Sequence, residues 1–212
     1  MENKVIATKK LGRGFFDRDT VLVAKELLGK YLVCETEEGK VVGKIIETEA
    51  YKGTDDLACH ASKGKTPRTE TLFGETGHLY VYLNYGIFWL TNIVAHKPND
   101  VGGVLLRSIE ITEGKEVARN RLARCKFVKA NDKLATGPGK LSVAFGIKGD
   151  FHTKDITKSG TIYIEDRGEN VPEQDIITAR RVGVDYAKHC KDYPWRFYIK
   201  DNKFISRPIP QG

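Results

Sequence analysis

The sequence contains no long apolar run, and that absence limits the classes of protein to which the chain can belong. No stretch approaches the ~20 consecutive apolar residues that a membrane-spanning helix needs, and the first residues contain no hydrophobic signal core. The 212 residues are 40% hydrophobic and 30% charged, which is typical of a soluble globular protein large enough to bury a core. We therefore expect a protein that acts away from membranes.

Cysteine and histidine are also scarce, and neither residue type shows the spacing of a known metal-binding motif. The four cysteines, Cys34, Cys59, Cys125 and Cys190, form no CxxC pair, which argues against a zinc site or a disulfide framework. We expect reduced thiols, most of them packing residues. The five histidines include no HExxH motif, so the residue types predict no metal site.

Internal repeats, low-complexity segments and linkers are absent as well, so we expect one compact domain over residues 1–212. Residues 21–29 carry apolar side chains on one helical face, with Asp17 or Asp19 as the cap and Gly29 at the end. Hairpins dominate and no regular βαβ alternation is visible, which predicts a mixed α/β (α+β) fold with a mainly antiparallel sheet flanked by helices. Strands are expected at 30–35, 41–49, 79–83, 87–94, 104–109, 161–165 and 196–199, a strand or turn at 176–184, and further helices at 113–125 and roughly 139–146.

The charge balance is basic, with a formal net charge of +7 and a pI of about 9.1. This balance favours a polyanionic partner, although the positive residues are spread along the chain and a merely soluble basic protein would fit too. Lysines and Arg68 around Thr66 offer donors for phosphate. The glycines of 136–141 precede a helix and leave backbone N–H groups that could hold a phosphate, as could any ordinary helix start.

Two acids, Glu47 and Glu49, stand at the end of an apolar run. Two residues apart in a strand, they point to the same face. Such a pair is usually a solvated sheet edge, but Tyr51 follows closely, and an acid between apolar and aromatic neighbours is expected to be partly desolvated. Arg107 is the lone charge in the apolar run 104–109, so it must be paired, and a carboxylate is its natural partner.

An aromatic hairpin is predicted after a long polar loop at 52–78. Tyr80 and Tyr82 alternate with leucine and valine, and Asn84-Tyr85-Gly86 has turn chemistry. If the turn lies there, Tyr85 is at the tip of a protruding hairpin and could be a wedge for a base stack. If the turn lies elsewhere, Tyr85 is an ordinary strand aromatic. The pattern leaves both readings open.

The order and spacing of these motifs resemble those of one known family. The likeness rests on 47–51, 55–60, 66–68, 79–82, 85–86, Asn92 and 105–107, and it continues through 15–17, 136–141, 179–184 and 196–198. On these residues the chain resembles the alkylpurine-DNA glycosylases, the 3-methyladenine DNA glycosylases of the mammalian alkyladenine type. The resemblance implies one compact domain with a curved antiparallel sheet. It also implies hydrolysis of the N-glycosidic bond of damaged purines, without metal or cofactor.

The resemblance further implies a role for each matching residue. Glu49 would activate water, with Arg107 and the backbone carbonyl of Val182 completing the cradle of that water. Asn92 would oppose the amino group of guanine at the floor of the pocket, and Tyr85 would fill the gap in the duplex. The walls around the flipped base would be Tyr51, His60 and Tyr82, and further DNA contacts would come from Gly86, Thr66, Arg68 and Lys140.

The resemblance also sets expectations about partners and place. The partner would be double-stranded DNA with damaged purines. The enzyme would be a monomer that starts base excision repair. The resemblance implies no lysine as a nucleophile, so no strand cleavage is expected. The protein would work in the cytoplasm near the nucleoid in a bacterium and in the nucleus in a eukaryote. Cys59 before His60 and the bulky Phe88-Trp89 depart from the family pattern, and they leave the range of damaged bases open.

Two rival functions fit parts of the sequence. A non-catalytic nucleic-acid module could use Tyr80, Tyr82 and Tyr85 as a stacking platform and would not need Glu49. A metal-dependent hydrolase could use the acids at 47, 49, 55 and 56 with His60, but one histidine is few for such a site. Base release and its response to a chelator distinguish the three readings.

Overall fold

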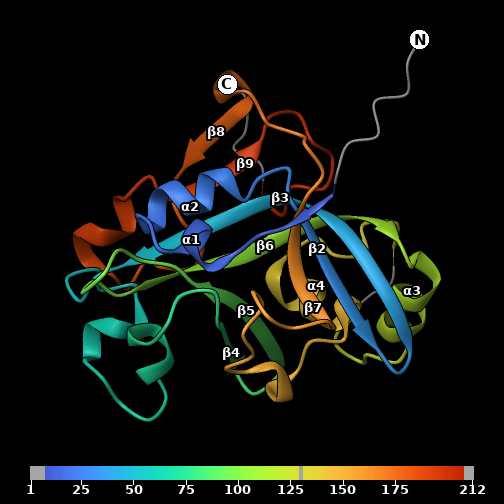
Figure 1. Cartoon of the computed structure of the whole chain (residues 1–212), viewed down its shortest axis with the longest axis horizontal. Coiled ribbons are helices and arrows are strands. Elements are labelled where there is room, and N and C mark those ends of the chain that lie inside the picture. Colours follow the sequence, from blue (N-terminus) through green and yellow to red (C-terminus); the bar gives the residue numbers. More distant parts are fainter. Residues whose placement is uncertain (1–7, 129–130, 208–212) are drawn as a thin grey trace.

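A curved antiparallel sheet organises the computed structural model, which describes residues 8–128 and 131–207 (Figure 1). Nine strands lie within these residues, and the sheet does not close on itself. The main path is β1-β7-β2-β3-β6-β5-β4, while β9 pairs with β3 and β8 pairs with β9. The strands are β1 (Lys9–Lys10), β2 (Tyr31–Thr36), β3 (Gly39–Lys52), β4 (Leu79–Asn84), β5 (Phe88–Val94), β6 (Gly102–Glu113), β7 (Ile162–Asp166), β8 (Ile176–Ala179) and β9 (Arg196–Ile199).

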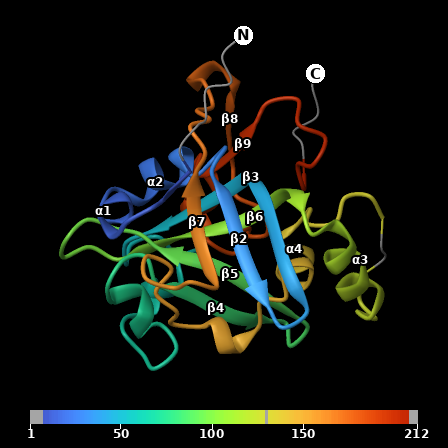
Figure 2. The same cartoon turned by 45° about the vertical axis from the view of Figure 1, so that its right-hand side comes forward.

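The helices are short and lie beside the sheet, as the mixed α/β prediction requires (Figures 1 and 2). Figure 2 shows α3 beside the turn of the β2–β3 hairpin. Among the described residues, none of the helices has both the length and the apolar character to cross a membrane. The α-helices are α1 (Arg13–Phe16), α2 (Thr20–Glu26), α3 (Lys115–Ala123) and α4 (Pro138–Phe145), and the 3₁₀ turns are η1 (His60–Lys63), η2 (Glu70–Phe73), η3 (Gly149–Phe151), η4 (Glu173–Asp175) and η5 (Lys188–Asp192).

Helix α2 begins directly after a predicted cap, and of the two candidate N-cap residues, Asp17 and Asp19, the cap is Asp19. Its carboxylate accepts hydrogen bonds from the backbone N–H groups of Val21 and Leu22, at 3.0 and 3.3 Å, so two of the unpaired donors at the helix start are satisfied. Gly29 follows the helix with a φ of +82°, a conformation that glycine adopts without steric strain. The buried face of α2 packs on β3, and Thr48 donates its hydroxyl to the carbonyl of Ala24 at 2.7 Å.

One face of the central strands forms the main core. Ile45, Leu106 and Ile93 are fully buried together with apolar residues of α2 and α4. Because side chains alternate across a strand, Leu105 and Arg107 point to the opposite face. That opposite face carries the acids of β3 and the cavity described below.

Strand β3 is longer than the predicted strand at 41–49, and its length positions the site. Its first half pairs with β2, and Glu47 to Glu49 pair with β9 on the same edge, while β6 covers the other edge. The β3–β6 ladder is irregular at three points, the first of them between Val42 and Gly43. Ile45 pairs with Ile109 and Glu47 with Ser108, so Ile46 is an extra residue on β3.

The third irregularity lies at Arg107. Glu47 pairs with Ser108 and Thr48 with Leu106, so Arg107 has no opposite residue in the ladder. An extra residue of this kind bends a strand and redirects its side chain. The bulge turns Arg107 toward both acids of β3, which confirms the prediction that a carboxylate pairs with this arginine.

The aromatic hairpin turns at Tyr85 and Gly86, which settles the alternative that the sequence left open. Their φ angles are +51° and +68°, and the N–H of Ile87 donates to the carbonyl of Asn84 at 3.0 Å. Two positive φ values in a two-residue turn match the twist of the flanking strands. The return strand begins at Phe88, one residue later than predicted, because Ile87 belongs to the turn.

Other predicted boundaries shift for local reasons. The predicted helix at 113–125 is the shorter α3, because β6 continues to Glu113 and Gly114 turns the chain with a φ of +74°. The predicted strand or turn at 176–184 is both, since β8 ends at Ala179 and the chain then turns. The four cysteines are free thiols, and three of them are buried, as expected.

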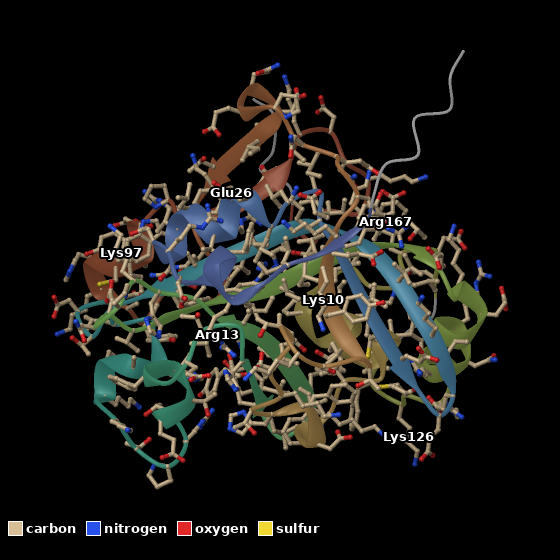
Figure 3. The ribbon with its side chains drawn as sticks, viewed as in Figure 1. Lys10, Arg13, Glu26, Lys97, Lys126 and Arg167 are labelled. Atoms are coloured by element: carbon tan, nitrogen blue, oxygen red, sulfur yellow. The ribbon has the colours of Figure 1, made fainter. Side chains whose placement is uncertain are left out.

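Charged side chains are dispersed around the molecule. Lys97, Lys126 and Arg167 lie at widely separated places in Figure 3 and come from different parts of the chain. Many basic side chains are also paired, and Arg167 bridges Glu113 and Glu165. The positive net charge therefore does not by itself mark a binding face.

Candidate active site

A cavity of about 430 Å³ lies on the face of the sheet that carries Arg107. The segment between β3 and β4 forms one wall; in Figure 1 it is the teal part that projects below the sheet. Four further segments complete the cavity: the aromatic hairpin, the start of α4, the loop after β8 and the last described residues. The side chains that bear on its chemistry are Tyr51, His60, Tyr80, Tyr82, Tyr85, Asn92, Arg107, Val182 and Tyr186.

Glu49 is fully buried and held by three donors that all line this cavity. One carboxylate oxygen, Oε1, accepts the backbone N–H of Val182 at 2.7 Å and lies 3.2 Å from Nη1 of Arg107. The other oxygen, Oε2, accepts the hydroxyl of Tyr51 at 2.7 Å. A carboxylate whose two oxygens both accept from charged or neutral donors is fixed in orientation.

Glu47 is equally buried, but its partners differ in kind. Its Oε1 accepts from Nε of Arg107 at 3.1 Å, Nη1 of Arg196 at 3.0 Å and the hydroxyl of Ser206 at 2.9 Å. Its Oε2 accepts the backbone N–H of Ser206 at 2.7 Å. These contacts tie β3 to β6, β9 and the C-terminal segment, so Glu47 belongs to an internal ion network; like Glu49, it is fully buried behind the residues that line the cavity.

Arg107 connects the two acids. Burial by itself lowers the pKa of the guanidinium, but the negative charges of Glu49 and Glu47 more than offset burial and raise that pKa. The side chain therefore stays protonated and reaches the cavity wall, with Nη2 donating to the hydroxyl of Ser206 at 3.2 Å. Ser206 was not recognised in the sequence, because nothing local connects it to a glutamate 159 residues away.

Tyr51 stands between Glu49 and a buried ion pair. Burial raises the pKa of its phenol well above the usual range, and the charge of Glu49 raises it further, so the phenol is a neutral donor. The guanidinium of Arg181 lies 4.7 Å from the centre of its ring. Arg181 and Asp56 form a fully buried two-pronged pair at 2.5 and 2.8 Å.

Arg181 also holds the backbone around the site. Its Nη1 donates to the carbonyl of Ala50 at 3.0 Å, and its Nη2 donates to that of Cys190 at 3.1 Å. The next residue, Val182, is the backbone donor to Glu49. In the sequence, Arg181 is only one of two consecutive arginines. Its side chain points inward because it pairs with Asp56, which lies 125 residues away in the chain.

Aromatic rings from η1 and β4 form another part of the cavity lining. His60 and Tyr82 have their ring centres 4.6 Å apart, and Nδ1 of His60 shares a hydrogen bond with the hydroxyl of Tyr80 at 2.8 Å. Burial, then the charges of Arg68 and Lys63, lower the pKa of His60 to about 4, so the imidazole is neutral at pH 7. Tyr80 was not predicted as a pocket residue, although its strand parity equals that of Tyr82.

Asn92 is buried on β5 and lines the same cavity. Its amide Nδ2 donates to the backbone carbonyl of Tyr80 across the β4–β5 ladder at 3.1 Å. That bond fixes the side chain in one position, as a selective contact at the cavity wall requires.

The residues expected to touch DNA lie outside or at the rim. Tyr85 is 90% exposed and borders the cavity. Gly86, Thr66 and Arg68 are exposed outside it, with Arg68 5.4 Å from the ring centre of Tyr82. Lys140 lines a separate shallow groove and donates to Asn131 at 2.6 Å.

Two of the acids that a metal-dependent hydrolase would need are paired with arginines instead. Asp56 is paired with Arg181 and Glu47 with two arginines. Across residues 8–128 and 131–207, no three histidine, cysteine, aspartate or glutamate side chains gather in an arrangement that could hold a metal ion. The buried carboxylates instead face guanidinium, phenol and backbone donors.

Comparison with known proteins places this arrangement in a family. Residues 14–203 match the family model for methylpurine-DNA glycosylase. Proteins named "Putative 3-methyladenine DNA glycosylase" are similar over 93–94% of this chain and 97–99% of their own length. Examples are those of Clostridium acetobutylicum (46% identity), Clostridium perfringens strain 13 (43%) and Methanocella arvoryzae (42%).

The chain therefore belongs to the methylpurine-DNA glycosylase family. The membership confirms the resemblance drawn from the sequence motifs. It defines a DNA glycosylase, a hydrolase of DNA repair that acts on alkylation damage, with DNA as its substrate.

Proposed function

We propose that this protein is a monofunctional glycosylase that flips alkylated or deaminated purines out of duplex DNA and hydrolyses their N-glycosidic bond. It works as a monomer and a single domain over residues 1–212, needs no metal or cofactor, and starts base excision repair. One observation carries the proposal: a buried carboxylate, Glu49, is held by three donors beside a cavity walled by aromatic rings. In a bacterial cell its place is the cytoplasm near the nucleoid.

The first step is extrusion of the damaged nucleotide. A base in a duplex cannot reach a buried carboxylate until it leaves the stack, which costs a few kcal/mol. Tyr85, 90% exposed at the hairpin tip beside the cavity, fills the vacated space and offsets part of that cost. Gly86 lets the turn approach the duplex closely, and Thr66, Arg68 and Lys140 contact phosphates of the flanking backbone.

The cavity then selects the flipped base. Tyr51, His60 and Tyr82 give flat walls on which a purine stacks, and electron-rich rings favour an electron-poor alkylated purine. His60 is neutral, so the wall does not repel a cationic base. Asn92, held in place by the Tyr80 carbonyl, crowds the exocyclic amino group of guanine and excludes the normal base.

The chemistry depends on Glu49. An alkylated purine is a good leaving group, so the bond breaks with oxocarbenium-like charge on the sugar, and a carboxylate stabilises that charge and removes a proton from the attacking water. Arg107 and the carbonyl of Val182 hold the water, and the N–H of Val182 and the hydroxyl of Tyr51 keep Glu49 oriented. Hydrolysis yields free base and an abasic site. No amine nucleophile is part of this arrangement, so the strand stays intact.

The test is base release from duplexes that each carry one lesion: 3-methyladenine, 7-methylguanine, hypoxanthine or ethenoadenine. We expect free base and abasic sites, with no strand break before alkali and no loss of rate in excess EDTA. Binding without base release would support the stacking-module reading, and loss of activity in EDTA that added metal restores would support a metal-dependent enzyme. Intact strands after release separate a monofunctional enzyme from a lyase.

A further inference from the structure

Tyr186 is a large aromatic side chain that is 69% exposed. It lies in the loop after β8, four residues beyond the backbone donor to Glu49. Burial of a tyrosine ring is normally favourable, so a ring left in water at a cavity rim needs a reason outside the folded chain. The mechanism proposed above does not use it.

The loop around Tyr186 holds the ring outward. Val184 and Ala187 are buried on either side, in a small apolar cluster with Ala58 and Cys190. The N–H of Ala187 donates to the carbonyl of Val184 at 2.9 Å, which closes a turn with Asp185 and Tyr186 at its corners. Because both ends of the turn are anchored in the protein, the ring projects from a fixed base.

The ring borders the cavity together with the hairpin tip. Tyr186, Tyr82 and Tyr85 all line the same cavity. After burial, the charges that shift the pKa of Tyr186 upward include that of Tyr85, and Tyr186 is among those that raise the pKa of Tyr82. Tyr186 is thus an electrostatic neighbour of both the inner wall and the exposed tip.

We propose that Tyr186 is a second aromatic contact for DNA, which stacks against the nucleotide that has left the duplex and so stabilises its flipped state. The inference rests on the proposed function. A nucleotide that occupies the cavity beside Glu49 lies within the lining to which the exposed Tyr186 belongs, and its sugar and base edge offer an apolar face to the ring. Tyr85 would act on the gap left in the duplex, whereas Tyr186 acts on the extrahelical nucleotide itself.

Because the two rings are proposed to contact different parts of the DNA, variants of Tyr85 and Tyr186 should respond differently to the structure of the DNA substrate. In a paired duplex, loss of either ring should lower the flipped fraction, because stacking on an aromatic is worth a factor of about 5 to 150. In a single-base bulge, extrusion is already cheap and the duplex gap matters little. Tyr85→Ala should then approach wild type, while Tyr186→Ala should keep its defect.

The experiment uses ethenoadenine, whose fluorescence reports unstacking, in a paired duplex and in a bulge. Flipped fraction and single-turnover release are measured for the wild type, Tyr85→Ala, Tyr186→Ala and Tyr186→Phe. Leu22→Ala is the matched control, because Leu22 is an exposed apolar side chain on α2 (42%) that does not border the cavity. Circular dichroism and thermal unfolding show whether each variant is folded.

We expect Tyr186→Ala to lose at least about fivefold in flipped fraction with both substrates, and Tyr186→Phe and Leu22→Ala to match wild type. Folded Tyr186→Ala that flips and releases the base like wild type would overturn the inference. So would an equal loss of binding to undamaged duplex, which would make Tyr186 a general DNA contact. If the wild type itself releases no base from any lesion, the proposed function fails, and that result is separate from any difference between variants.

Discussion

Glu47 and Glu49 are two residues of the same type, two positions apart on one strand, on one face and equally buried, yet their surroundings differ. Both acids share Arg107, but Glu47 is also held by Arg196, which does not line the cavity, and by Ser206, whereas Glu49 is also held by Tyr51 and Val182, which do line it. Burial alone does not separate the carboxylate proposed to act in catalysis from one that only pairs within the protein. The identity of the donors and their access to a ligand do.

The largest effect that tests this contrast is expected from Glu49→Gln. The amide keeps the size of the side chain but can neither remove a proton from water nor stabilise positive charge, so the single-turnover rate should fall roughly 100-fold or more. Binding to lesion-bearing duplex should stay near that of wild type. A variant that releases base at the wild-type rate would remove Glu49 from the chemistry.

The reciprocal change, Glu47→Gln, should act mainly on stability. Hydrogen bonds to a charged group are each worth about 1.5–3 kcal/mol, and the amide weakens those from Arg107 and Arg196, so the free energy of unfolding should fall by about that amount or more. Denaturant unfolding measures the loss. Where the variant is folded, its rate should fall far less than that of Glu49→Gln, and equal losses of rate would mean that the two acids share the chemistry.

Selectivity is tested on the other side of the cavity with Asn92→Ser. The shorter side chain removes the group proposed to crowd the amino group of guanine, so release of undamaged guanine should rise by roughly tenfold. Release of hypoxanthine, which lacks that amino group, serves as the internal control. If guanine is still ignored, selectivity comes from the poor leaving ability of the normal base.

The smallest expected effect concerns His60. Its imidazole is a neutral group in the cavity lining, whereas the two acids are paired with charged arginines. Its pKa is about 4 in the folded protein against about 6.5 in an unfolded chain. The unfolded state therefore binds the extra proton first, and stability should fall as the pH drops from about 6.5 to about 4. Denaturant unfolding at several pH values should show a weaker dependence in His60→Gln, and an unchanged dependence would assign it to other groups.

Much of the local structure could be predicted from the sequence. The cap at Asp19, the β2–β3 hairpin and the apolar runs of β5 and β6 depend on neighbours in the chain, and local pattern captures them. A lone arginine in an apolar strand also predicts a carboxylate partner, because an unpaired charge is too costly to bury. The turn at Tyr85 was left open, since Asn84-Tyr85-Gly86 fits a strand end and a hairpin tip equally.

The choice between the two acids lay beyond local pattern. Strand parity places Glu47 and Glu49 on one face and cannot tell them apart. They are distinguished by Ser206 and Arg196 on one side and by Val182 on the other, all distant in the chain. The bulge at Arg107 likewise arises from the register of two strands, and register is a property of the pair.

The sequence by itself determined which residue types were available: acids beside aromatics, a paired arginine, an aromatic hairpin and the order of motifs that places the chain in its family. Which of these residues contact one another was determined only by the tertiary structure. Arg181 reaches Asp56 across 125 residues and Ser206 reaches Glu47 across 159, and the N–H of Val182 reaches Glu49 across 133. Local preferences act over a few residues, whereas the geometry of a site is set by groups that folding brings together.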